Sequence, residues 1–123
     1  MRKYNISYEP EQDDLFLYNP IAKSKGSVEF GDLVLDYNYK KELVGIQMLH
    51  ASKFLSDFIE MQENKIKSFL KEVTACAVET RTKNNMLIIK IHFIGKEKEI
   101  TPVISIPSLT TSSPALAYGR SGL

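Results

Sequence analysis

The sequence lacks the features that mark several common classes of protein. Its 123 residues include one cysteine, Cys76, so no intramolecular disulfide can form. The opening residues, MRKYNISYEP, contain no apolar core of a signal peptide, and no stretch approaches the ~20 apolar residues of a membrane helix. We therefore expect a cytoplasmic protein in a reducing compartment, with no membrane partner.

An excess of charge of one sign is also missing. Sixteen basic side chains stand against fifteen acidic ones, which gives a net charge of +1. This balance produces no overall field that would attract nucleic acid. The lysines of the helical stretch, Lys53, Lys65, Lys67 and Lys71, are interspersed with acids, as on an ordinary solvated face. Nucleic-acid binding through them is the third and least favoured of our hypotheses.

Motifs of the common enzyme and cofactor classes are missing too. There is no glycine-rich phosphate loop, no G-x-S-x-G and no nucleotide fingerprint. Two histidines and one cysteine without close spacing do not make a zinc site. Cys76 has small neutral neighbours, which favours a half-buried structural thiol, and His92 alternates with Lys90 on the polar side of a strand. We expect no cofactor.

What the sequence does contain is a clear pattern of strands in its first half. Apolar residues alternate with polar ones in five short segments, and the spacing between segments is short, which predicts an antiparallel meander. Proline and acids predict a turn over Glu9–Asp14, and Gly31–Asp32 predicts a second turn. The five predicted strands cover about residues 4–8, 15–18, 27–30, 33–37 and 43–49.

A helical segment follows, from about Ser52 to Glu72, with Ser52 as the predicted N-cap. Gln62 and Glu63 interrupt its apolar stripe, so it forms one long helix or two short ones, and two are favoured. Strand patterns then return over about residues 73–82, 87–93 and 100–106. Pro102 places the last of these at a sheet edge or in a bulge.

The order of these elements predicts an α+β fold, in which antiparallel β-meanders pack against one or two central helices. We expect a single domain over residues 1–107. It comprises a first meander at about 4–53, the helical segment at 52–72 and a second meander at 73–106. Residues 108–123 are small, polar and punctuated by glycine and proline, which predicts a C-terminal tail.

Two motifs in the first half resemble those of a known family. YEPEQDDLFLY (8–18) resembles a Tyr-acid-Pro-Glu-x-Asp-x-Leu pattern. LVLDYNYKKELVGIQMLHASK (33–53) resembles an apolar run, Asp-Tyr, a polar turn and Val-Gly-Ile-x-x-Leu-x-Ala-Ser. In this order they resemble the family catalogued as domain of unknown function 2283, over about residues 6–53 and with a longer C-terminal extension here.

The resemblance implies a small antiparallel meander, and no catalytic residue is established for the family. Gln47 stands where the family usually has glutamate. Members are often encoded beside small toxin-like proteins, so the resemblance also implies an antitoxin-like role and a protein partner from an adjacent gene.

The acids of the first turn are the candidates for a metal or hydrolytic site. Glu11 and Asp13, with His50, could offer ligands to a divalent cation, but the turn lacks the glycine of a calcium loop. The favoured interpretation is turn chemistry, in which Asp13 accepts hydrogen bonds from backbone amides and His50 occupies a strand–helix corner. Asp36 closes a turn about 20 Å from His50, too far to orient it.

A surplus of apolar residues is the most informative feature. Ile88 and Ile106 look left over once the inward faces are assigned, with Tyr39 beside them, and Leu116 and Tyr118 could anchor the tail. Such positions favour burial against another chain, so we expect a homodimer. The favoured function is a non-enzymatic protein-interaction and oligomerisation module. The alternative is a small-ligand or metal-binding protein with weak hydrolase-type activity.

Overall fold

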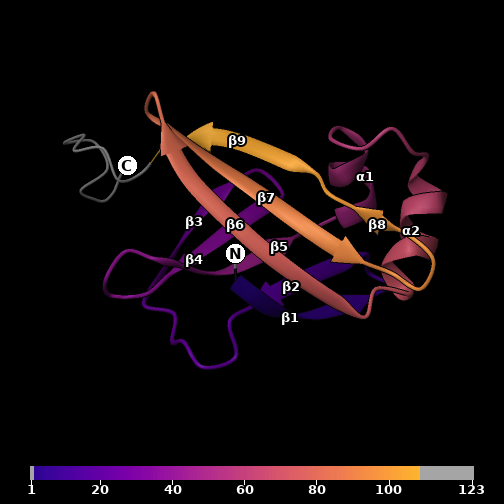
Figure 1. Cartoon of the computed structure of the whole chain (residues 1–123), viewed down its shortest axis with the longest axis horizontal. Coiled ribbons are helices and arrows are strands. Elements are labelled where there is room, and N and C mark those ends of the chain that lie inside the picture. The colour runs from indigo at the N-terminus through magenta and orange to yellow at the C-terminus, as the bar shows by residue number, and fades with distance from the viewer. Residues whose placement is uncertain (1, 109–123) are drawn as a thin grey trace.

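The computed structural model describes residues 2–108, in which five strands precede two short helices and four strands follow them (Figure 1). This arrangement confirms the predicted α+β fold class. The elements are β1 (Arg2–Glu9), β2 (Asp14–Tyr18), β3 (Gly26–Phe30), β4 (Leu33–Tyr37), β5 (Leu43–Met48), α1 (Ala51–Ser56), α2 (Glu63–Lys71), β6 (Ala75–Lys83), β7 (Met86–Ile94), β8 (Glu99–Ile100) and β9 (Val103–Pro107).

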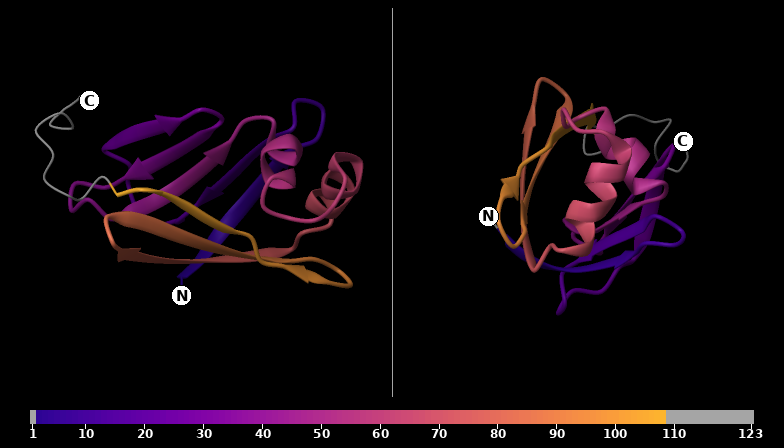
Figure 2. Two further views of the ribbon diagram at one scale, coloured as in Figure 1. Left: turned by 90° about the horizontal axis from the view of Figure 1, so that it is seen from above. Right: turned by 90° about the vertical axis from the view of Figure 1, so that its right-hand side faces the viewer.

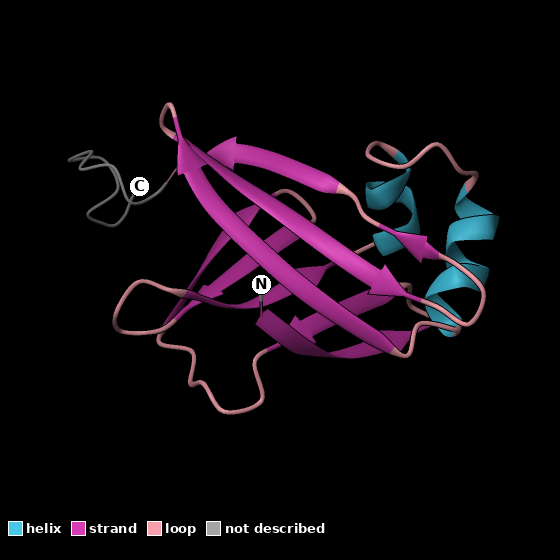
Figure 3. Ribbon diagram, viewed as in Figure 1, coloured by secondary structure: helices cyan, strands magenta, loops and turns pink. Residues whose placement is uncertain are grey.

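The strands form one antiparallel sheet in the order β3-β4-β5-β2-β1-β6-β7-β8, and β9 also pairs with β7. β1 divides its pairing along its length: Arg2–Tyr4 pair with β6, whereas Asn5–Glu9 pair with β2. The sheet therefore turns at β1 into two layers that face each other, a first layer of β1–β5 and a second layer of β6–β9 (Figure 2). Both helices lie at one end of the molecule (Figure 3).

The core fills the space between the layers and the helices. Side chains alternate across each strand, so the inward positions of both layers meet apolar residues of α1 and α2. The largest fully buried side chains are Leu15, Leu17, Leu33, Leu35, Ile46 and Met48 from the first layer, Ile89, Ile91, Phe93 and Ile104 from the second, and Leu55 and Ile66 from the helices.

The helical segment is divided into two helices, as the interrupted apolar stripe predicts. α1 ends at Ser56, a turn follows, and Gln62 has an extended backbone directly before α2. The predicted N-cap is wrong by two residues. His50, with φ 52° and ψ 50°, occupies that position, and Ser52 is buried within the first turn of α1. Neither helix of residues 2–108 is long and apolar enough to cross a membrane.

Proline and asparagine shape the second layer. Pro102 separates β8 from β9, and both of these strands pair with the edge of β7 that faces away from β6. This edge position agrees with the prediction made from Pro102, which has no backbone N–H to donate. Asn84 and Asn85 form the tight turn between β6 and β7 with φ 52° and 63°, because asparagine tolerates the left-handed region better than most residues.

Candidate functional site

The corner between β5 and α1 is held by Asp13, which lies in the turn after β1. Its carboxylate accepts hydrogen bonds from the Tyr8 hydroxyl at 2.5 Å, the Ser52 hydroxyl at 2.6 Å and the Ser52 N–H at 3.1 Å. Its carbonyl oxygen accepts from the Ala51 N–H at 2.8 Å. Burial, reinforced by the Asp13 carboxylate, raises the pKa of Tyr8. Asp13 thus supplies the capping contacts of α1 from the turn between β1 and β2, which lies beside the end of β5.

The other predicted metal candidates do not join Asp13. His50 is exposed at the corner, and its Nδ1 lies 3.5 Å from Oδ1 of Asp32. Glu11 is exposed in the turn and donates its N–H to the Glu9 carboxylate at 3.1 Å. No group of three or more His, Cys, Asp or Glu in the described part of the chain is placed to hold a metal ion. The structure therefore does not bring Glu11, Asp13 and His50 together into one site.

Asp36 forms a second structural contact, with Gly45 on the neighbouring strand. Its buried carboxylate accepts hydrogen bonds from the Ser27 hydroxyl and, at 3.3 Å, from the Gln47 amide. A Cβ atom at position 45 would lie 2.7 Å from Oδ2 of Asp36, so any other residue there would displace the Asp36 carboxylate. Asp36 and Gly45 stand opposite each other on β4 and β5, and the register of the two strands shifts between Asp36 and Tyr37.

Cys76 and His92 occupy opposite sides of the second layer. Cys76 is buried in the core, its Sγ lies 3.4 Å from the carbonyl oxygen of Tyr4, and burial raises its pKa to about 11. This is the setting of a structural thiol. His92 points away from the core. Its Nε2 is buried without a hydrogen-bond partner within residues 2–108 and lies 3.7 Å from a carboxylate oxygen of Glu79.

The outward side of β6, β7 and β9, here termed the open face, carries apolar side chains that nothing in the described structure covers. Ile94 is 40% exposed and Val103 46% exposed, and Ile88 is half-buried on the same side. In both views of Figure 2 the helices and the first layer lie on the other side of this layer. The open face is therefore a surface where another molecule could bury apolar area.

The predicted interface residues lie in different places. Ile88 lies on the open face, and Tyr39 is exposed in the loop between β4 and β5. Ile106 corrects the expectation: it is only 8% exposed and belongs to the core, because the inward positions of β9 complete the second layer. Leu116 and Tyr118 lie outside the described residues.

A pocket of about 330 Å³ opens between the layers, lined by β1, β6 and the loop between β4 and β5. Sequence reasoning missed it, although the inward positions of β6 change from Cys76 and Val78 to Thr80 and Thr82, and that change marks where the core ends. Its lining residues are Arg2, Tyr4, Tyr37, Lys41, Glu42, Leu43, Val78, Glu79, Thr80, Thr82, Leu87 and Ser108.

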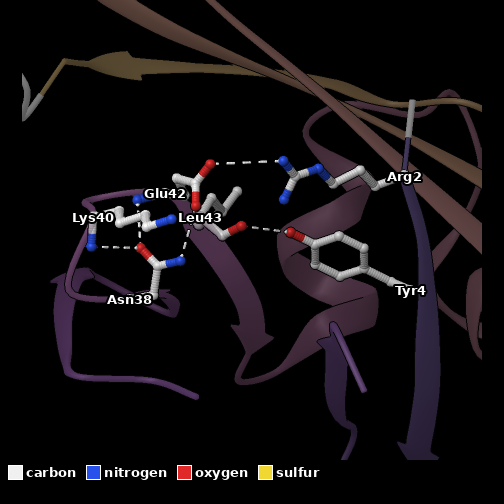
Figure 4. Close-up of polar contacts among 6 residues, drawn as sticks. All are labelled: Arg2, Tyr4, Asn38, Lys40, Glu42 and Leu43. Carbon is white, nitrogen blue, oxygen red and sulfur yellow. Dashed lines mark hydrogen bonds and ion pairs between the residues drawn. The ribbon is translucent and has the colours of Figure 1, made fainter. Parts of the chain in front are cut away.

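Polar contacts hold the rim of this pocket (Figure 4). The Tyr4 hydroxyl donates to the carbonyl oxygen of Leu43 at 2.8 Å, which joins β1 to the start of β5. The Asn38 amide group donates to Glu42 at 3.0 Å, and its oxygen accepts from the Lys40 and Glu42 N–H groups at 2.9 Å. The Arg2 guanidinium lies 3.7 Å from Glu42.

The electrostatics of the rim follow from these contacts. The hydrogen bond from Asn38 lowers the pKa of Glu42, with a smaller contribution from Arg2. Burial raises the pKa values of Tyr4 and Tyr37 to about 12, so both side chains are neutral hydroxyls at physiological pH. The rim therefore presents the Glu42 carboxylate, which Asn38 and Arg2 contact, together with the cations Arg2 and Lys41 and the neutral hydroxyl groups of the tyrosines.

The fold and these contacts define an α+β protein with an antiparallel sheet, in which the motif residues Asp13, Asp36, Gly45 and Ser52 hold the architecture. A family model described as "Protein of unknown function (DUF2283)" matches residues 5–52. An uncharacterised protein of Methanocaldococcus jannaschii is 31% identical over 110 residues, which cover 89% of this chain and 90% of that protein. No solved structure matches.

The chain belongs to this family of proteins of unknown function. The matched segment corresponds to the first layer together with the corner that Asp13 and Ser52 hold. Similarity to the relative from M. jannaschii spans more residues than the family model, so it extends into the helices and the second layer. The longer C-terminal half is therefore shared with that protein.

Proposed function

We propose that the protein is a non-enzymatic interaction module that binds a second copy of itself through the open face. The observation that carries this proposal is a set of partly exposed apolar side chains on one outward side: Ile88 and Val103 at diagonal positions of β7 and β9, and Ile94 at the end of β7, with Lys90 between them. Single exposed apolar residues are normal, whereas several on one side of a sheet without a covering element favour burial against another chain. A two-fold dimer is the simplest assembly that buries this face.

The test compares two isoleucines that differ in their surroundings. Ile94→Glu places a charge on the open face, whereas Ile21→Glu does so in the loop after β2, where Ile21 is 92% exposed. We expect sedimentation velocity at micromolar concentration to show dimers for the parent chain and Ile21→Glu, and monomers for Ile94→Glu. A monomeric parent, or an Ile94→Glu variant that dimerises like the parent, contradicts the proposal.

We also propose that the protein is cytoplasmic. The family resemblance further suggests an antitoxin-like role, in which the interaction module binds a different protein. The open face would then bind the product of an adjacent gene in place of the second copy. Co-purification of the two expressed proteins should succeed with Ile21→Glu and fail with Ile94→Glu. Equal recovery with both variants would place that partner elsewhere on the surface.

A further inference from the structure

The pocket between the layers contains more hydrogen-bond donors than the described residues use. Lys41 has no ion-pair partner for its ammonium group, and the hydroxyl groups of Tyr37, Thr80 and Thr82 have no hydrogen-bond partner among residues 2–108. Arg2 is held only by Glu42 at 3.7 Å, which is longer than a hydrogen bond, so its guanidinium retains free donors.

The acids that line the pocket, in contrast, already have partners. Glu42 accepts from Asn38 and faces Arg2, and the carboxylate of Glu79, which also lines the pocket, lies 3.7 Å from Nε2 of His92. The lining groups left without a protein partner among residues 2–108 are therefore the Lys41 ammonium, the remaining donors of Arg2, and hydroxyl groups that can both donate and accept. Such a set selects an anion over a cation.

The inner wall of the pocket is apolar. Leu43, Val78 and Leu87 are buried at its base, beside the ring of Tyr4. A volume of about 330 Å³ lies at the lower end of the range for small-molecule sites, which combine an apolar lining with a few placed polar groups. The occupant should therefore have an apolar part as well as a charge.

We infer that this pocket binds a small organic anion, with its carboxylate between Arg2 and Lys41 and its apolar part against Leu43, Val78 and Leu87. The site is independent of the proposed dimer, because none of Ile88, Ile94 and Val103 lies in its lining. Its ligand chemistry also differs from the metal-dependent alternative considered from the sequence, since neither Asp13 nor His50 lies in the lining.

The test uses three probes at constant ionic strength, followed by the backbone amide signals of the full chain in NMR titrations. Hexanoate should shift the signals of Leu43, Val78 and Leu87 saturably. Hexanamide, which has the same shape without the charge, should bind about tenfold more weakly or less. Inorganic phosphate should bind more weakly than hexanoate, because it has no apolar part.

Variants then assign the charge to the rim. Arg2→Gln and Lys41→Gln should each weaken hexanoate binding by about tenfold, whereas Lys23→Gln, in the loop before β3, should leave it unchanged. Circular dichroism checks that each variant folds. Equal binding of hexanoate and hexanamide, phosphate binding as tight as hexanoate, or unchanged binding by Arg2→Gln would each overturn the inference. The Ile94→Glu variant should still bind hexanoate, so this result is separate from the dimer test.

Discussion

At the scale of single residues, the family motifs are explained by contacts that hold the backbone. Asp13 has φ 58°, a conformation that acids and asparagine tolerate, and each of its hydrogen bonds goes to a donor in Tyr8, Ala51 or Ser52. The first motif supplies the acceptor, and the second motif supplies three of the donor groups, from Ala51 and Ser52. The spacing between the motifs is thereby tied to the length of the first layer.

Replacing Asp13 by asparagine should destabilise the protein because the buried donors of Ser52 and the half-buried hydroxyl of Tyr8 lose a charged acceptor. We expect the free energy of unfolding to fall by about 1–3 kcal/mol. Asp14→Asn is the matched control, since the neighbouring side chain has no such partners, and it should change stability by less than about 0.5 kcal/mol. Urea denaturation of both variants measures the difference, and equal effects would show that Asp13 has no special role.

At the scale of elements, periodicity predicted most strands, the division of the helical segment and the edge position after Pro102. These features depend on local sequence: alternation, a polar interruption and a missing N–H. The register between β4 and β5 and the cap of α1 could not be predicted in this way. Both depend on contacts between residues distant in sequence: Asp36 packs against Gly45, and Asp13 accepts hydrogen bonds from Ser52.

The pairing of β4 with β5 can be tested at Gly45. Gly45→Ala should cost about 1–3 kcal/mol of stability, because its Cβ would overlap the Asp36 carboxylate. Gly26→Ala is the control, since a Cβ there meets no atom within 4 Å. In an Asp36→Ala background the cost of Gly45→Ala should largely disappear. Additive effects in this double-mutant cycle, measured by thermal or urea unfolding, would contradict the packing explanation.

At the scale of the whole molecule, the two layers are joined along β1 and enclose a core that is closed by helices at one end and opens into the pocket at the other. Tyr4 belongs to this junction: it pairs with β6, and its hydroxyl donates to Leu43 of the first layer. The surfaces left for function, the pocket and the open face, follow from how the layers meet. Local patterns do not determine that geometry. Sequence analysis therefore predicted only Ile88 of the open face and did not predict the pocket.

Alkaline pH should weaken this junction. The pKa values of Tyr4 and Tyr37 are about 12 in the folded protein, whereas an unfolded tyrosine ionises near pH 10. Between these values the unfolded chain binds fewer protons, so the free energy of unfolding should fall as the pH rises from about 10 to 12. Tyr4→Phe should show a shallower decline in denaturant titrations. Tyrosinate absorbance that reveals Tyr4 ionising near pH 10 in the folded protein would contradict this prediction.

The lengthwise division of β1 also has a consequence for the order in which a newly made chain can fold. Asn5–Glu9 find their partner in the next strand to be synthesised, so the first layer can close while translation continues. Arg2–Tyr4 must wait for β6, which leaves the ribosome only after both helices. The earliest residues of the chain thus complete their hydrogen bonding among the last, and they fasten the late half of the protein to the early one.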